Sequence, residues 1–351
     1  MEMEPLMSTS TNAFYRNTAF LCAAALVLAA CSENATTPTP RGIVAGASSQ
    51  DVSPEMNSPN GHGIVFPTRD WFAHNAKPGG AGGGTGIYYH GGSVLQAQTK
   101  VVAVYWSANT IYNNGPTPGS TGTGSQDGSL VGYFLSNLGG SPYFNINTTY
   151  TDGGGNHINN IVNYIGYWAN NTNAPSGSQS VSDADMLNML SSGFNSGALS
   201  YDANTLYAIF TSGAVNLGGG FGSQYCAYHY WGTVNVGGQN KNVIYDAMPY
   251  DYAYPSACTM SGTYAAPNGD PGADYEVNTL AHEVEEATTD MYGNAWYDRR
   301  GYENADKCAW TFGTVHSNGT GTYNIQFGGK DWLVQRNWVN AGSGGCATQY
   351  P

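Results

Sequence analysis

The chain has 351 residues, 41% of them hydrophobic, which is enough for one large or two small packed domains and excludes wholesale disorder. Charged residues make up 10% of the chain, against roughly 25% in an ordinary soluble domain. With 11 Lys plus Arg, 24 Asp plus Glu and a net charge of -13, the chain lacks the basic surface that neutralises phosphates. This composition excludes nucleic-acid binding.

The N-terminal 31 residues predict an export signal. The apolar run Thr18 to Ala30 follows the basic Arg16 and is too short to span a bilayer as a permanent helix, so residues 1–31 are expected to be a signal peptide. The end of the run, Leu28-Ala29-Ala30-Cys31, resembles the lipobox of bacterial lipoproteins. Cys31 is therefore the expected site of lipid attachment, and a cysteine buried at the end of an apolar helix is the alternative.

The next segment, residues 32–86, is rich in Pro, Ser, Thr, Asn and Gly and is expected to be a tether. This tether would keep a folded domain, residues 87–351, away from the membrane surface. The lipid would anchor the chain to that membrane. The expected location is the bacterial cell envelope, with the folded domain outside the cytoplasm.

Strand and helix patterns alternate irregularly in the folded part, which predicts an α+β domain with a mixed twisted sheet. Two β-rich apolar runs are typical of buried strands, and two stretches predict helices, the second with a capping box of Ser182 and Asp185. The strands are Lys100 to Ser107 and Thr205 to Thr211, and the helices are Ser129 to Leu138 and Ser182 to Phe194. Near the C-terminus, Thr322 to Phe327 and Asp331 to Val339 flank Gly328-Gly329 and predict a hairpin.

Four cysteines beyond Cys31 indicate two disulfides in an exported chain, with three possible pairings. They are Cys226, Cys258, Cys308 and Cys346. Loop closure favours the sequence neighbours, 226 with 258 and 308 with 346. A zinc site made of all four cysteines is the competing interpretation, although the chain has no CxxC pair to support it.

The sharpest local motif is PNGDPGADYEVNTLAHEVEEATTD, residues 267–290. After the Pro/Gly turn, Asp274 is expected to cap a helix that runs to about Thr289. At about 100° per residue, His282 and Glu286 lie one turn apart, on the side opposite an apolar face.

This arrangement matches the way in which HExxH helices present two ligands to zinc, with Glu283 beside them as general base for a water. Here Glu286 takes the place of the second histidine, so the motif is HExxE. The sequence therefore predicts a zincin-like active-site helix. An amphipathic helix with a solvated polar face is the alternative.

A third metal ligand must come from elsewhere in the chain. Glu303 follows the helix at an interval from Glu286 comparable to that in HExxH peptidases of the gluzincin type. His229, beside Cys226, ranks nearly equal with Glu303, although a histidine among aromatic residues is often a hydrogen-bonded core residue. Asp306 ranks third.

Several of these segments together resemble the bacterial branch of the Exordium or phosphate-induced protein family. The segments are PNGD, the VNTLAHEVEEATTD helix, NAWYD, ENADKCAW and LVQRNW, with weaker likeness at VVAVYWS and SPYFNINTTY. The resemblance covers residues 87–346 and implies an exported protein associated with walls or surfaces, linked in plants to growth control. It implies no established reaction, and many plant members lack the His-Glu pair of the helix.

Two functions follow as hypotheses. The first is a membrane-anchored zinc-dependent hydrolase, most simply a metallopeptidase, with His282 and Glu286 as ligands, His229 or Glu303 as the third ligand and Glu283 as general base. The second is a non-catalytic cell-surface protein that binds polysaccharide or another envelope component through Tyr, Trp and Asn, with a structural polar helix face or a calcium site. Peptide or polysaccharide is thus the expected partner, and the oligomeric state stays open.

Overall fold

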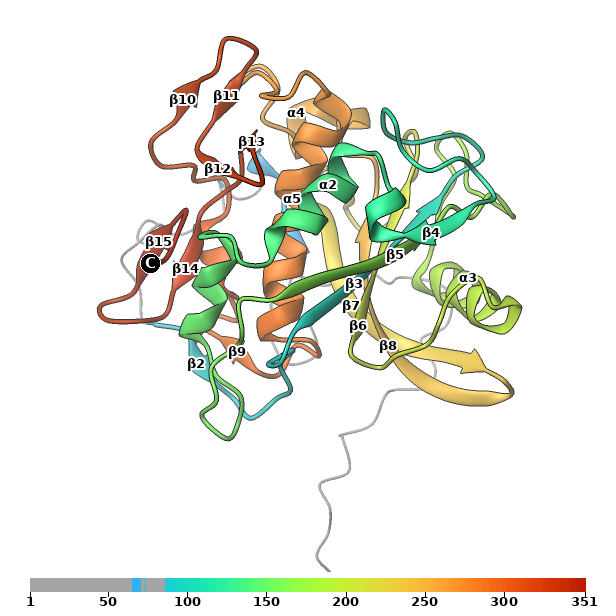
Figure 1. The fold of residues 1–351 in the computed structure, drawn as a ribbon, viewed down its shortest axis with the longest axis horizontal. Helices are drawn as coiled ribbons and strands as arrows, with labels where there is room; N and C mark the ends of the chain where they lie inside the picture. The colour runs from blue at the N-terminus through green and yellow to red at the C-terminus, as the bar shows by residue number, and fades with distance from the viewer. Residues whose placement is uncertain (1–64, 71–72, 74–85) are drawn as a thin grey trace, which may run out of the picture. The chain divides into compact units, whose positions relative to one another are not determined.

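The computed structural model describes residues 65–70, 73 and 86–351, whose centre is a seven-stranded mixed sheet (Figure 1). The predicted signal peptide, the lipid attachment at Cys31 and most of the predicted tether lie outside the described residues. Within the described part, no helix is both long and apolar enough to cross a membrane. The expected α+β class, with a mixed sheet and two disulfides, is confirmed.

The sheet has the strand order β1-β7-β8-β6-β3-β5-β4. Its strands are β1 (Val65–Pro67), β3 (Thr99–Trp106), β4 (Thr121–Thr123), β5 (Val162–Trp168), β6 (Thr205–Thr211), β7 (Tyr225–Val236) and β8 (Gln239–Met248). Strands β5, β3, β6 and β8 are parallel, whereas β4, β7 and β1 pair antiparallel at the two edges. The predicted strands over residues 100–107 and 205–211 are the two at the centre of this sheet.

Helices cover both faces of the sheet, which explains the unbroken apolar runs of its central strands. Val101 and Ala103 of β3 pack in the same hydrophobic cluster as α2 (Leu130–Leu138) and α5 (Pro271–Thr289). The alternating Val102 and Val104 pack in the cluster of α3 (Asp183–Ser196), on the other face (Figure 1). Both predicted helices in this part of the chain are confirmed, as is the capping box of Ser182 and Asp185.

Helix α5 begins earlier than its sequence predicts. Asp270, not Asp274, is the N-cap residue and accepts a hydrogen bond from the Ala273 N–H, with Pro271 at the first helical position. The Asp274 carboxylate instead accepts hydrogen bonds from the backbone N–H groups of Asn268 and Asp270, so it closes the preceding turn. Every α5 residue from Gly272 to Thr289 is buried, and the alternative of a solvated polar face is therefore wrong.

Short elements complete the domain beside α5. They are β2 (Tyr88–Tyr89), β9 (Trp296–Tyr297), β10 (His316–Ser317), β11 (Thr322–Tyr323), β12 (Ile325–Phe327), β13 (Lys330–Trp332), β14 (Asn337–Val339), β15 (Gly345–Ala347), the short helix α4 (Pro255–Cys258) and the 3-10 helices Gly124–Gln126, Phe144–Thr149, Asp251–Ala253 and Asp306–Cys308. The predicted hairpin about Gly328-Gly329 forms between β12 and β13 but is shorter than expected. Its second strand ends at Trp332, because Thr322 and Tyr323, which would continue the ladder, pair with β10 instead, and the Val334 N–H donates to Asn324 Oδ1.

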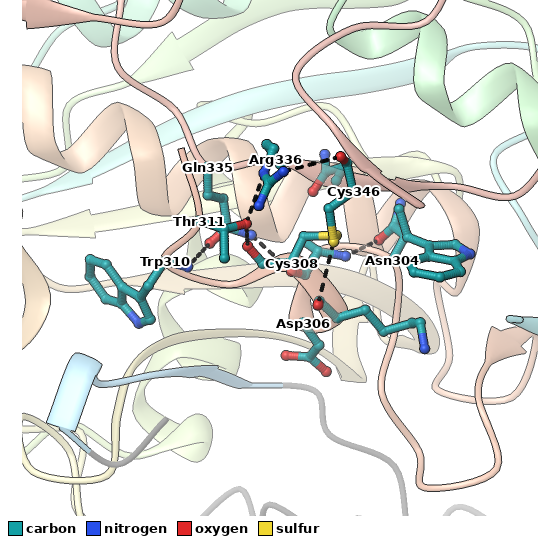
Figure 2. The surroundings of a disulfide bond; sticks show 12 residues. Asn304, Asp306, Cys308, Trp310, Thr311, Gln335, Arg336 and Cys346 are labelled. Atoms are coloured by element: carbon teal, nitrogen blue, oxygen red, sulfur yellow. Dashed lines mark hydrogen bonds between the residues drawn. A yellow bond between two sulfur atoms is a disulfide. The ribbon is translucent and has the colours of Figure 1, made fainter. Parts of the chain in front are cut away.

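The disulfides join Cys226 to Cys258 and Cys308 to Cys346, so the pairing favoured by loop closure is confirmed and the four-cysteine zinc site is wrong. The first ties β7 to α4. The second ties the Asp306–Cys308 turn to β15, and Figure 2 shows Asp306, Trp310 and Gln335 gathered around it.

Leu280 of α5 is fully buried in the cluster shared with the sheet, and we expect Leu280→Ala to lower the free energy of unfolding by about 2–5 kcal/mol through lost packing and a cavity. Ile161→Ala, at a position 47% exposed, is the control; it should change that free energy by about 0.5 kcal/mol or less. Urea denaturation measures both, and equal effects would contradict the core position of Leu280.

Candidate metal centre

Three parts of the fold bring acidic and imidazole side chains together inside the domain. Helix α5 supplies His282, Glu283 and Glu286, β7 supplies His229, and the segment after α5 supplies Glu303 and Asp306. All six side chains are almost completely buried. Two groups of three have ligand atoms that all lie within 4.8 Å of one another: His229, Glu286 and Glu303, and His282, Glu286 and Asp306. Glu286 belongs to both groups.

In the first group, His229 lies between carboxyl groups on both sides of its ring. Its Nδ1 is 3.4 Å from Glu283 Oε2 and 3.6 Å from Glu286 Oε2, and its Nε2 is 3.6 Å from Glu303 Oε2. Ligand atoms at roughly 2.0–2.2 Å from a tetrahedral zinc lie about 3.3–3.6 Å from one another. The distances to Glu286 and Glu303 involve different ring nitrogens, so they are not separations between one set of ligand atoms. One ligand atom from each of His229, Glu286 and Glu303 lies within 4.8 Å of the other two, which is wider than this spacing but close enough to make the group a candidate for a shared cation.

Hydrogen bonding leaves the donors of this first group unsatisfied. Among the described residues, His229 Nε2, Glu286 Oε2 and both carboxyl oxygens of Glu303 have no hydrogen-bond partner as long as the carboxyl groups are ionised, although all are buried; a protonated Asp290 hydrogen-bonds to Glu303. Native proteins satisfy nearly all buried polar atoms, so such a cluster indicates a missing partner. When Nδ1 of His229 donates to Glu283, the lone pair of Nε2 faces Glu303, which is the tautomer that ligation through Nε2 requires.

In the second group, His282 Nε2 lies 3.1 Å from Glu286 Oε1 and 3.6 Å from Asp306 Oδ1. Gln335 determines the tautomer of this ring. Its amide nitrogen donates to the Ala305 carbonyl at 3.0 Å, and its oxygen accepts from the Trp310 N–H at 3.4 Å. The same nitrogen lies 3.0 Å from His282 Nδ1, so that atom accepts and the ring proton resides on Nε2.

The two carboxyl oxygens of Glu286 therefore differ in their hydrogen bonding. Oε1 accepts the backbone N–H of Asp306 at 2.9 Å and faces the Nε2–H of His282, whereas Oε2 is unpartnered. Buried atoms without a hydrogen-bond partner among the described residues thus lie on both sides of Glu286: His229 Nε2 and the two Glu303 oxygens on one side, and His282 Nε2 on the other. His282 lies on this other side, with its Nε2 close to Glu286 Oε1.

The electrostatics of this region require a cation or bound protons. Six carboxyl groups are buried around the two histidines: Asp246, Glu283, Glu286, Asp290, Glu303 and Asp306. Burial raises the pKa of all six, and repulsion from neighbouring carboxylates adds to it at Glu283 and Glu303. Burial lowers the pKa of His229 to about 3 and that of His282 to about 4, so neither imidazole supplies positive charge near pH 7.

Asp246 is a member of this cluster that sequence reasoning missed. It lies on β8 directly across from His229 of β7, and neither of its carboxyl oxygens has a hydrogen-bond partner among the described residues. Burial raises the pKa of the Asp246 carboxyl, and repulsion from Glu286 raises it further. The signal available in the sequence is a lone acidic residue inside the apolar run VIYDAM, which is unusual for a buried strand.

Comparisons with known proteins concern the same region. A family model for the phosphate-induced protein 1 conserved region matches residues 140–328, more than half of the chain and all residues of both groups. Protein EXORDIUM-like 3 of Arabidopsis thaliana is 26% identical over 156 residues, which cover 38% of this chain and 46% of that protein. The match thus spans less than half of the relative's length. No solved structure matches the chain significantly.

In chelator-treated protein, Asp290 is expected to make stability fall as the pH rises from 6.5 through about 7, and the fall should level off by pH 8. Burial raises the pKa of Asp290 to about 7. Up to that pH the folded state keeps a proton that the unfolded state has already lost. The free energy of unfolding therefore falls by about 1.4 kcal/mol for each pH unit and each such proton. The histidines act in the opposite direction, but only below their unfolded pKa of about 6.5.

Urea denaturation at pH 6.5, 7 and 8 measures this effect, and Asp290→Asn should show a smaller fall. Stability that stays constant or rises over this range would contradict the buried, protonated carboxyls.

Proposed function

This chain belongs to the phosphate-induced protein 1 family, and we propose that it is a metal-dependent hydrolase whose cation is held by His229, Glu286 and Glu303. Membership assigns no reaction, so the proposal rests on the site. The observation that carries it is the convergence of three buried donors whose facing atoms have no hydrogen-bond partner among the described residues. His282, Glu286 and Asp306 form the alternative ligand set.

Zinc is the cation we propose, because an imidazole with carboxylates is a donor set that zinc accepts. A divalent cation would offset the repulsion among the buried carboxylates and polarise a carbonyl or a water. Glu283 is the proposed general base. Its Oε2 lies near His229 Nδ1, while Oε1 has no hydrogen-bond partner in the described part of the chain, and its raised pKa suits proton transfer.

The expected substrate is a peptide, and the expected setting is outside the cytoplasm. Two disulfides favour an oxidising compartment. The bacterial envelope location, with lipid at Cys31, remains part of this proposal and rests on the sequence of residues 1–31.

A second candidate function is favoured by the burial of the site. Because the donors are almost fully buried, the cation could instead be a structural lock in a non-catalytic surface protein that binds polysaccharide or envelope components. Structural metal sites are closed, whereas catalytic sites keep an open position. Substitution of Glu283 separates the two.

We expect the full chain to bind one zinc per molecule. His229→Ala and Glu286→Gln should weaken zinc binding by at least about 100-fold, because each removes a ligand, which costs more than removing a group that only orients a ligand. His282→Ala should weaken it less, by about 10- to 100-fold, because His282 holds Glu286. Glu285→Gln is the matched control, since Glu285 lies on the same helix, equally buried, and belongs to neither group.

Titration with a competing chelator measures these affinities. If His282→Ala abolishes binding while His229→Ala leaves it intact, the ligands are His282, Glu286 and Asp306 instead.

Glu283→Gln should keep the zinc, because the Gln oxygen still accepts from His229 Nδ1, but should lower peptide hydrolysis by about 100- to 10,000-fold. The assay is release of fluorophore from a quenched peptide mixture, with Glu285→Gln again as control. Hydrolysis that Glu283→Gln and chelator leave unchanged would refute the catalytic role. If zinc raises the melting temperature of the protein but no peptide is hydrolysed, the result would favour the structural lock.

A further inference from the structure

A short strand at the edge of the sheet, β1, packs against His282 beside the candidate metal centre. Strand β1 lies in the segment that the composition predicts to be a tether, and the packed domain therefore extends further toward the N-terminus than residue 87. It pairs antiparallel with β7, with Phe66 opposite Ala227 and Pro67 opposite Tyr225. The Thr68 N–H continues this pairing by donating to the Gln224 carbonyl at 2.9 Å.

Phe66 fills a position between two rings next to the site. Its ring centroid lies 4.5 Å from that of His282 and 4.7 Å from that of Trp310, on which it stacks. The Trp310 indole N–H donates to the Pro67 carbonyl at 2.7 Å. Phe66 is fully buried, so the strand closes the domain directly over the imidazole of the HExxE helix.

We propose that this edge of β7 is the peptide-binding edge of the site, and that β1 is its occupant from the same chain. An extended peptide would pair antiparallel with β7 as β1 does and place an aromatic side chain between His282 and Trp310. The role of that peptide as substrate rests on the proposed function, whereas its binding does not.

The edge pairing of β1 and the aromatic contact of Phe66 support this inference. Main-chain pairing at a sheet edge accepts many sequences, and specificity comes from the pockets for alternate side chains. Here one aromatic pocket lies beside proposed catalytic machinery, which is where a bound peptide would meet it. Because β1 is covalently joined to the domain, it competes at an effective concentration on the order of millimolar.

The test measures binding of a fluorescein-labelled peptide, Val-Phe-Pro-Thr-Arg-Asp, which is the sequence of residues 65–70. Fluorescence anisotropy is recorded with the full chain in the presence of chelator, so the result does not depend on metal or hydrolysis. In the full chain, Phe66→Ala weakens the docking of β1 and should raise the affinity for the peptide by at least about 10-fold over the unsubstituted chain. A peptide with Ala in place of Phe should not bind.

A second variant covers the case in which Phe66→Ala unfolds the chain. Thr68→Pro removes the N–H that bonds to Gln224 but leaves the aromatic contact in place, and it should also raise peptide affinity. Phe194→Ala is the control, because Phe194 is an aromatic residue of α3 in the cluster on the other face. Folded variants of Phe66 and Thr68 that bind the peptide no better than the unsubstituted chain would overturn the inference. Peptide binding in this assay, together with no hydrolysis of the same peptide after zinc is restored, would overturn only the proposed function.

Discussion

The concentration of carboxyl groups around Glu286 is the constraint on which the rest of the structure depends. In a chain with few charged residues, Glu283, Glu286 and Glu303 lie fully buried within a few ångströms of His229. Each ionised carboxylate taken out of water costs several kcal/mol unless it is paired. Neutral imidazoles supply no positive charge to offset this cost, so these groups must share protons or a cation.

The fold holds this cluster rigidly. Helix α5 is buried on all sides, so the direction of Glu286 is determined by packing and not by solvent. Pairing of β7 with β8 brings His229 and Asp246 opposite each other. The Cys308–Cys346 disulfide holds the turn that carries Asp306 (Figure 2). Gln335 links that turn to His282. Rigid donors favour binding, since little ordering remains to be done when a cation enters.

Local patterns predicted the parts of this structure that are local. The periodicity of residues 277–289 placed His282 and Glu286 one turn apart, and the capping box located the start of α3. Local patterns could not predict which residues far apart in the sequence lie side by side. Nothing in the sequence near His229 or Asp246 indicates which face of α5 they contact. Three candidates for the third ligand therefore stayed open.

Two further features escaped prediction for physical reasons. A polar face of a helix is normally solvated. The burial of both faces of α5 depends on other segments of the chain that pack against it, and the sequence of α5 does not indicate them. The short β1 lies within a stretch of Pro, Ser and Gly, where one buried aromatic residue, Phe66, has no periodic neighbours to reveal a strand.

Anomalous X-ray diffraction at the zinc absorption edge, from crystals of the full chain soaked in zinc, tests the central claim most directly. The expected result is one peak roughly 2.0–2.2 Å from His229 Nε2 and from carboxyl oxygens of Glu286 and Glu303. A fully occupied peak elsewhere, or no peak beside carboxyl groups that hydrogen-bond to one another, would contradict the assignment of this cluster as a metal centre.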